Sequence, residues 1–330
     1  MARNDTVLVL GATGGIGGEV ARQLCDAGWQ VRGLQRGAAE GKRDGITWFA
    51  GDAMDAQAVR RAAKGCSVIV HAVNPPGYRG WAQLVLPMLD NTIAAAKAEG
   101  ATIVLPGTVY NFGPDALPLL KEDSPQHPVT RKGAIRVEME KRLEDASREG
   151  AVRVLIVRAG DFFGPKPGNN WFSQGLLKVG QPVKAVSYPG RPDTGHQWSY
   201  LPDVARTMVE LLARRDRLEP FARFHMAGHW DADGTRMSGA IRKVVVRRTG
   251  AQAPRVSAFP WWLVTLASPF VTTFREMREM RYLWNTPVQM DNAKLVAFLG
   301  REPHTPLEEA VEAALDGMGS LGAAPLAVAA

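Results

Sequence analysis

The chain has 330 residues, enough for two average domains or for one α/β domain with a smaller accessory part. Hydrophobic residues make up 45% and charged residues 22% of it, which excludes a disordered, collagen-like or fibrous protein. The net charge of +7 helps to attract an anionic ligand, but no block of basic residues indicates nucleic-acid binding.

The two cysteines, Cys25 and Cys66, have no CxxC or Cys/His spacing that would hold zinc. So few cysteines fit a reducing compartment. The apolar run near the N-terminus has only five residues, too few for the core of a signal peptide. We therefore expect a cytoplasmic protein without a metal site.

Apolar runs alternate with helical patterns from the N-terminus onward, which is typical of parallel βαβ units. The runs predict six strands, at residues 6–10, 30–34, 46–50, 67–72, 102–105 and 152–157. Helical patterns lie between them, at residues 16–27, 55–63, 83–99 and 131–149. Together these elements predict an α/β fold with a Rossmann-like, doubly wound parallel sheet.

Beyond residue 164 the alternation gives way to turns rich in Gly, Pro, Asn and Asp, which indicates a smaller C-terminal cap on the substrate side. We expect a NAD(P)-binding Rossmann domain at residues 1–216, with a substrate-side insertion around 165–195. The cap region then covers residues 217–320 and a flexible tail residues 321–330.

Two helices are predicted in this second half. The segment 202–214 has an apolar stripe that would pack back on the sheet. The segment 306–315 begins with a proline and an acidic first turn, which favour a helix start.

Many aromatic and methionine side chains fall in the cap, and they predict either a partly apolar substrate pocket or the cap's own core. They are Trp171, Phe172, Trp198, Trp230, Trp261, Trp262, Met277, Met280, Tyr282 and Trp284. The most apolar stretch, residues 258–274, is too short and too broken by prolines to span a bilayer. We interpret it as a buried helix, a lid or an oligomer surface, with membrane association as the less favoured alternative.

A glycine-rich loop joins the first strand to the first helix in the sequence VLVLGATGGIGGEV. Gly11 permits the tight turn, Gly14 lets backbone amides approach a diphosphate, and Gly17 lets the helix pack closely on the strand. An ordinary turn is the alternative. The strand before the loop and the amphipathic helix after it favour a dinucleotide site.

The second strand ends in Gln35 and Arg36, where a NAD site would have an acidic residue for the ribose hydroxyls. A guanidinium at this point suits the 2′-phosphate of NADP(H), and Lys42 and Arg43 follow nearby. The alternative is that Arg36 is a solvated loop cation. We expect NADP(H) to be preferred over NAD(H).

Several segments together resemble the extended short-chain dehydrogenase/reductase family, and more loosely its atypical members and the nucleotide-sugar epimerase/dehydratase group. These segments are GATGGIG from Gly11, GDAMD with Asp52, HAVNPPG from His71, RAGDFFGP from Arg158, HQWSYLPDVA from His196, and the C-terminal DNAKLVAFLGREPHTPLEEAV. The resemblance implies cofactor contacts by Gly11, Thr13, Gly14, Gly15, Ile16, Gly17, Arg36, Asp52, Ala53, His71, Ala72, Val73, Lys132, Ala159, Asp161 and Phe162.

The catalytic segment departs from the family pattern YxxxK, in which the Lys lowers the pKa of the Tyr phenol so that it can exchange a proton. Lys132 fits the Lys position, but Pro128 stands four residues before it. On the predicted helix, Lys132 shares the buried face, which favours a pocket-facing Lys over a solvated one.

The family's Ser would fall within LPGTVYNFG, where Thr108 carries a hydroxyl and Tyr110 is the nearest phenol. We expect Thr108 or Tyr110 to polarise the substrate oxygen while Lys132 holds the ribose; the alternative is that Tyr110 only lines the cleft.

Asp161 replaces the Asn of the family's RPGNVYGP, so its carboxylate would lie near the nicotinamide or, alternatively, cap a turn. His127 and His196 are further titratable candidates, although a lone loop histidine is usually solvated.

The favoured function is an NADP(H)-dependent oxidoreductase that acts on a carbonyl, enone or sugar-like substrate. The missing tyrosine leaves open a non-catalytic NADP(H)-binding sensor or regulatory protein, and more distantly an assembly factor. We expect a small-molecule substrate, no nucleic-acid or membrane partner, and a monomer or homodimer.

Overall fold

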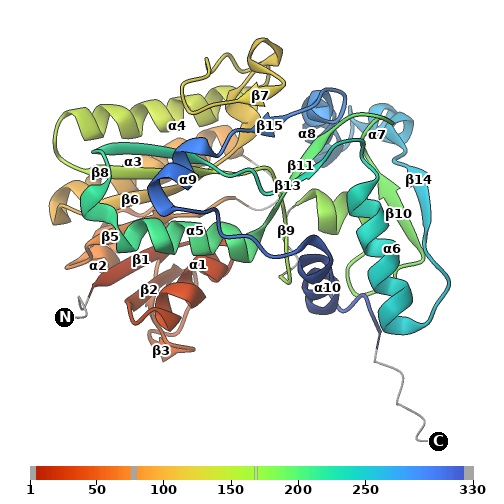
Figure 1. Ribbon diagram of the computed structural model, residues 1–330. Helices are drawn as coiled ribbons and strands as arrows, with labels where there is room; N and C mark the ends of the chain where they lie inside the picture. The colour runs from red at the N-terminus through yellow and green to blue at the C-terminus, as the bar shows by residue number, and fades with distance from the viewer. Residues whose placement is uncertain (1–4, 76–79, 167, 169, 323–330) are drawn as a thin grey trace, which may run out of the picture.

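The computed structural model describes residues 5–75, 80–166, 168 and 170–322. Its main sheet has eight strands in the order β12-β8-β6-β5-β1-β2-β4-β3, and β3 alone pairs antiparallel (Figure 1). The strands are β1 (Thr6–Leu10), β2 (Gln30–Gln35), β3 (Gly41–Arg43), β4 (Ile46–Ala50), β5 (Val68–His71), β6 (Thr102–Gly107), β8 (Arg153–Arg158) and β12 (Phe221–His225). This order confirms the predicted doubly wound sheet.

The six predicted strands form the centre of the sheet, and their bounds agree with the prediction to within two residues. The prediction missed β3 and β12. The three residues of β3 are all exposed and form no apolar run. The strand β12 pairs with β8 although it lies beyond residue 216, so the sheet draws its last strand from the part of the chain that we expected to be the cap.

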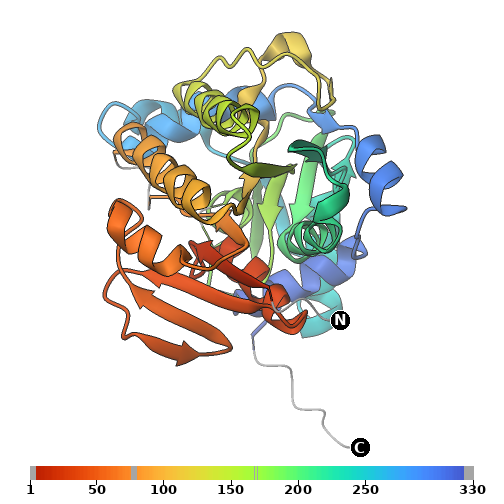
Figure 2. The same ribbon diagram turned by 90° about the vertical axis from the view of Figure 1, so that its left-hand side faces the viewer.

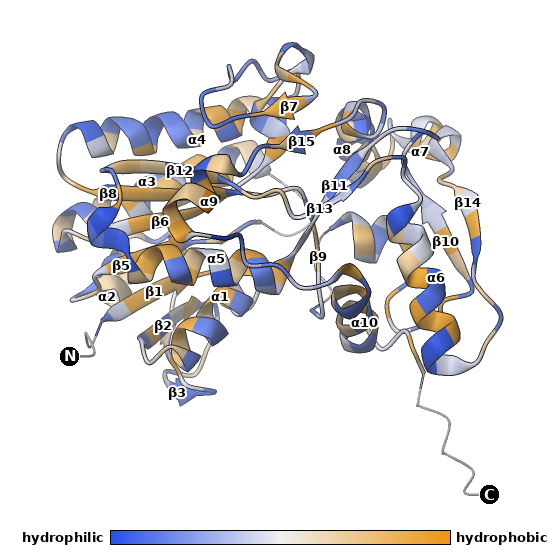
Figure 3. Ribbon diagram, viewed as in Figure 1, coloured by the Kyte–Doolittle hydropathy of each residue, from blue (hydrophilic) through white to orange (hydrophobic). Residues whose placement is uncertain are grey.

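Helices cover both faces of the sheet, because each buried strand sends alternate side chains to opposite sides (Figure 2). In β1, Val7 and Val9 belong to the core under α1 and α5, whereas Leu8 and Leu10 belong to the core under α2, α3 and α4. Figure 3 shows the central strands as hydrophobic and the outer side of α4 as hydrophilic. These helices are α1 (Gly15–Asp26), α2 (Ala56–Ala63), α3 (Trp81–Glu99), α4 (Arg131–Arg148) and α5 (Leu201–Ala213).

The second part of the chain builds the cap around a separate core. Its helices are α6 (Arg236–Thr249), α7 (Trp261–Ala267), α8 (Thr272–Glu279), α9 (Ala293–Leu299) and α10 (Leu307–Gly317). Its small sheets pair β9 (Asp161–Phe163), β11 (His196–Tyr200) and β13 (His229–Asp231); β10 (Ala185–Tyr188) and β14 (Arg255–Ala258); and β7 (Leu119–Leu120) and β15 (Gln289–Met290). The helix α9 lies against β12 of the main sheet rather than in the cap core.

The cap's large side chains divide between the cap core, the cavity wall and the surface. Phe172, Trp198 and Trp284 are almost fully buried within that core. The stretch 258–274 is not a buried helix, because Trp262 and Phe270 are largely exposed. No helix in the described part of the chain is long and apolar enough to cross a membrane. Of the predicted flexible tail, residues 323–330 lie outside the described residues.

Candidate active site

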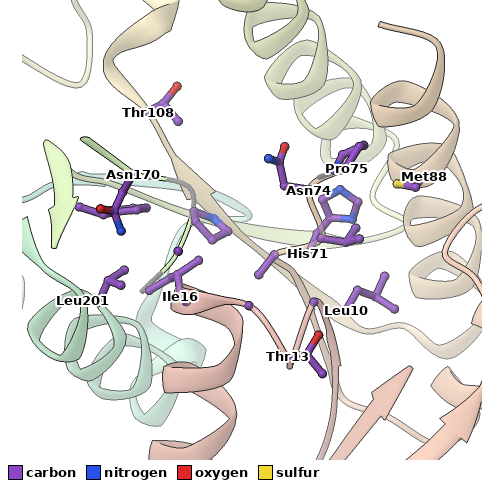
Figure 4. A pocket seen from close by; sticks show the side chains of 18 of the residues that line it. Leu10, Thr13, Ile16, His71, Asn74, Pro75, Met88, Thr108, Asn170 and Leu201 are labelled. Atoms are coloured by element: carbon purple, nitrogen blue, oxygen red, sulfur yellow. The ribbon is translucent and has the colours of Figure 1, made fainter. Parts of the chain in front are cut away.

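A cavity of about 680 Å³ opens between the carboxyl ends of the parallel strands and the cap, where ligands bind in doubly wound folds (Figure 4). Leu10 ends β1, His71 ends β5 and Thr108 follows β6, while Asn170 and Leu201 approach from the cap side. Of the residues that we expected to contact the cofactor through the family resemblance or to act in catalysis, all but Gly17 line this cavity.

The glycine loop has the close backbone packing that a diphosphate cradle requires. Gly11 has φ +90°, and a Cβ atom there would lie 2.5 Å from the carbonyl oxygen of Ala72. A Cβ on Gly17 would collide with the carbonyl of Gly11, so Gly17 brings α1 onto the loop without facing the cavity. Gly14 directly precedes α1, whose first turn carries no acidic residue. The amides at this helix start are therefore suited to a diphosphate.

The adenosine end of the cavity combines a cation with a carboxylate. The side chain of Arg36 is 73% exposed, and its Nε atom lies 3.8 Å from Oδ2 of Asp52. The Arg36 guanidinium is therefore largely open to solvent and could bind an anion. Lys42 and Arg43 lie on β3 and do not line the cavity, so they do not extend the cationic site as we expected.

His71 forms part of the cavity wall as a neutral side chain. Its Nδ1 atom lies 2.8 Å from Oγ1 of Thr92, and that hydroxyl donates to the carbonyl of Met88. The Thr92 oxygen can therefore only accept a hydrogen bond from the histidine ring, which assigns the proton to Nδ1 of His71. Burial, with a smaller contribution from Arg136, lowers the pKa of His71 to about 3.

Lys132 lies in the first turn of α4 and is 5% exposed, unlike a solvated helix-start lysine. Its Nζ atom lies 3.0 Å from Oε2 of Glu276 in the cap helix α8. Burial lowers the pKa of Lys132, although the Glu276 carboxylate opposes this shift. The neighbouring backbone amide of Arg131 donates to Glu279 at 2.6 Å, so two glutamates tie α8 to the start of α4.

Thr108 and Tyr110 follow β6 and face the same cavity as Lys132. The Thr108 hydroxyl donates to Oδ1 of Asn111 at 3.4 Å, and its carbonyl accepts from Nη1 of Arg158 at 2.5 Å. Arg158 is almost fully buried and also forms an ion pair with Glu140 at 2.8 Å. This buried pair anchors the start of the turn that carries Thr108 and Tyr110.

The Asp161 carboxylate lines the cavity and pairs with His196, whose Nε2 atom lies 2.9 Å from Oδ2. The His196 ring stacks on Trp284 at 3.8 Å, so His196 is a buried cap residue and not a solvated loop histidine. His127 is exposed and pairs with Asp115, and it does not line the cavity.

Several cavity residues escaped the sequence analysis because their proximity arises only in the fold. They include Glu276 in the cap and Lys166, whose ammonium would lie 3.6 Å from a Cβ on Gly18 in α1. Trp171, Met277 and Met280 also line the cavity, in agreement with the partly apolar pocket that the sequence offered as one alternative for them. Lys166 directly follows the RAGDFFGP segment, which is the one signal that could have identified it. The remaining residues that we did not predict include Asn74, Arg136, Asn170 and Gln174.

Solved structures with the same fold include sugar-nucleotide enzymes with bound NAD. MoeE5 in complex with UDP-glucuronic acid and NAD is 17% identical, with a TM-score of 0.71 over 95% of this chain and 98% of that one. The UDP-glucose 4-epimerase from Brucella ovis in complex with NAD is 15% identical, with a TM-score of 0.73 over 96% and 98%. The UDP-glucose 4-epimerase from Bifidobacterium longum in complex with NAD+ and UDP is 16% identical, with a TM-score of 0.71 over 94% and 97%.

At these identities the likeness shows the fold alone. No protein with a curated description matches the sequence. The sequence profile of the NAD-dependent epimerase/dehydratase family, in contrast, matches residues 7–227, which is more than half of the chain. This match confirms the resemblance that the motifs indicated. The chain therefore belongs to the NAD-dependent epimerase/dehydratase family of enzymes.

Proposed function

We propose that the protein is an NADP(H)-dependent oxidoreductase that interconverts a hydroxyl and a carbonyl group on a small, sugar-like substrate. The observation that carries this proposal is that one cavity contains both the glycine loop of the diphosphate site and the Lys132, Thr108 and Tyr110 side chains. Solved relatives of the same fold hold NAD with UDP-glucuronic acid or UDP, which makes a sugar nucleotide the first substrate class to test.

The residues around the cavity divide into a cofactor half and a substrate half. Gly11, Gly14 and the start of α1 would hold the diphosphate, Arg36 the adenosine phosphate and Lys132 the nicotinamide ribose. The bound nicotinamide supplies the hydride chemistry. Thr108 and Tyr110 are placed to hydrogen-bond the substrate oxygen, and Asp161, oriented by His196, faces the same end.

Glu276 fills the chemical role that Pro128 leaves open. An alcohol that gives its C–H hydrogen to the nicotinamide as hydride must also lose its O–H proton to become a carbonyl. In our proposal the Glu276 carboxylate accepts that proton, and it returns the proton when the hydride comes back. Its side chain is 13% exposed in the cavity wall, and its Oε2 atom lies 3.0 Å from the Lys132 ammonium.

Cofactor preference provides a direct test of Arg36. We expect tighter binding of NADPH than of NADH, by tenfold or more, or about 1.4 kcal/mol. Arg36→Ala should reduce NADPH affinity at least tenfold and leave NADH affinity within about twofold, because only NADPH carries the 2′-phosphate. Titrations at constant salt, followed by nicotinamide fluorescence, measure both dissociation constants.

The matched control is Lys42→Ala, which removes an exposed cation that does not line the cavity. Equal losses for both cofactors in Arg36→Ala would contradict the role of Arg36. If neither NADPH nor NADH binds, the oxidoreductase proposal is wrong.

The catalytic role of Glu276 is tested by Glu276→Gln, which keeps the size and polarity of the side chain but removes the base. We expect turnover to fall about 10²-fold or more, since general base catalysis contributes 10²- to 10⁴-fold. Cofactor affinity should change little. Nicotinamide absorbance with UDP-glucose and UDP-glucuronic acid as first substrates follows the reaction.

Glu144→Gln on the exposed side of α4 is the control and should keep full turnover. Unchanged turnover in Glu276→Gln would exclude Glu276 as the base and make Tyr110 the next candidate for that role.

Pro128 in place of the family's tyrosine favours one alternative, a protein that binds NADP(H) and regulates a partner without turnover. Sustained NADPH consumption with any small molecule would exclude this alternative. Tight cofactor binding without consumption across a broad substrate panel would support it.

A further inference from the structure

The helix α7 and the turn that follows it carry a row of exposed apolar side chains at the edge of the cap, where α7 and α8 lie side by side (Figure 1). Exposed fractions reach 67% for Trp262, 69% for Leu266 and 89% for Phe270. Leu263 and Val271 complete the row at 45% and 40%. We call these five residues the α7 ridge.

The inner side of the same helix is anchored to the cap. Val264 is 3% exposed, and the indole of Trp261 donates to the carbonyl of Pro189 at 2.8 Å. The helix is thus held in place by its inner face, while the outer face is largely exposed among the residues that the structure describes. Side chains as exposed as Phe270 stand clear of their surroundings, which makes the ridge a projection and not a groove.

Three arginines, Arg275, Arg278 and Arg281, lie beside the ridge and are exposed. Within the described residues none of them forms a salt bridge: Arg278 donates to the Ser268 hydroxyl, and Arg281 stacks over the Trp261 ring. The acidic residues of α8, in contrast, pair with Lys132 and Arg131 at the start of α4. Positive charge is therefore left uncompensated next to the exposed apolar row.

A projecting apolar row that includes a tryptophan, flanked by arginines that form no salt bridge with the described residues, is suited to the interface of a lipid bilayer. Each basic residue near an anionic membrane adds to the attraction, and the net charge of +7 attracts the whole molecule. A second copy of the chain fits this face less well. A symmetric contact would bring the arginines of both copies together, and a stable interface needs about 800 Å² from each partner.

We propose that the α7 ridge and its three arginines dock the protein on the surface of an anionic phospholipid bilayer. This inference replaces our expectation that the protein has no membrane partner, and it does not depend on the proposed reaction. The apolar side chains enter the headgroup boundary, and the arginines contact lipid phosphates.

Co-sedimentation with vesicles tests the proposal, using the full chain and two compositions: phosphatidylcholine alone, and phosphatidylcholine with phosphatidylglycerol. We expect at least tenfold stronger binding to the anionic vesicles. Leu266→Ser with Phe270→Ser should weaken that binding at least tenfold. Arg275→Gln, Arg278→Gln and Arg281→Gln together should abolish the difference between the two vesicle types.

The matched control is Val179→Ser with Val246→Ser, which removes exposed apolar side chains outside the ridge and should leave vesicle binding unchanged. Wild-type protein that sediments with neither vesicle type overturns the proposal. So does a wild-type dimer, seen by light scattering, that the Leu266→Ser, Phe270→Ser variant converts to a monomer, because the ridge would then join two copies of the chain.

Discussion

Glu140→Gln should destabilise the protein by about 3 to 5 kcal/mol, although the two side chains have nearly the same shape. The Glu140 carboxylate accepts from Arg158 at 2.8 Å and from Asn111 and Gln126 at 3.0 Å each. All three partners are donors, so an amide would place a further N–H group among them. It would also leave the Arg158 guanidinium buried without its counter-charge. Urea unfolding followed by circular dichroism measures the loss.

Two variants show whether the effect comes from an unpaired buried charge. Glu144→Gln removes the exposed partner of Arg148 from the same helix and should cost less than about 1 kcal/mol. Glu140→Leu combined with Arg158→Met removes both charges and should recover much of the lost stability. A Glu140→Gln protein as stable as wild type would show that the pair does not hold this part of the fold.

Acidification should destabilise the protein steeply below about pH 6.5. Burial lowers the pKa of His71, His225 and His229 to about 3 in each case. The folded protein therefore keeps these rings neutral, whereas the unfolded chain protonates them near the ordinary pKa of 6.5. Each histidine subtracts up to about 1.4 kcal/mol of unfolding free energy per pH unit between pH 6.5 and 3 and has little effect above that window.

Urea unfolding at a series of pH values between 7.5 and 5 measures this slope. His229 offers the matched variant, because neither of its ring nitrogens has a hydrogen-bond partner within the described residues. His229→Leu should remove about one proton from the number taken up on unfolding. The slope of unfolding free energy against pH should therefore fall by about 1.4 kcal/mol per pH unit. An unchanged slope would mean that His229 protonates as readily in the folded protein as in the unfolded chain.

The main sheet could be predicted because a parallel strand buried on both faces is a continuous apolar run. The runs at 6–10, 102–105 and 152–157 all became central strands. The edge strand β3 lacks such a run. In β12 the sequence FARFH is interrupted by Arg223 and is not a continuous apolar run, so its pairing with β8 depends on tertiary contacts that no local pattern contains.

The candidate site likewise contains residues that a local sequence pattern reveals and residues that only the fold brings together. The glycine loop is a local feature, so its residues could be recognised from spacing alone. Glu276 lies 3.0 Å from Lys132 but 144 positions after it, and nothing in the sequence around α8 indicates that proximity. The cap aromatics could not be assigned for a related reason, since composition does not distinguish a pocket wall from a core: Trp171 lines the cavity, whereas Phe172 and Trp198 belong to the cap core.

The helix α8 connects two surfaces of the molecule that differ in purpose. Its glutamates bind the start of α4 beside the cavity, while its arginines are exposed to solvent. Glu276 and Arg278 are only two positions apart in this helix, so the residue of our proposed reaction and a residue of our proposed membrane contact belong to one short rigid element. Binding to a membrane surface and catalysis would then share this helix, and turnover would differ between the membrane-bound and the free enzyme.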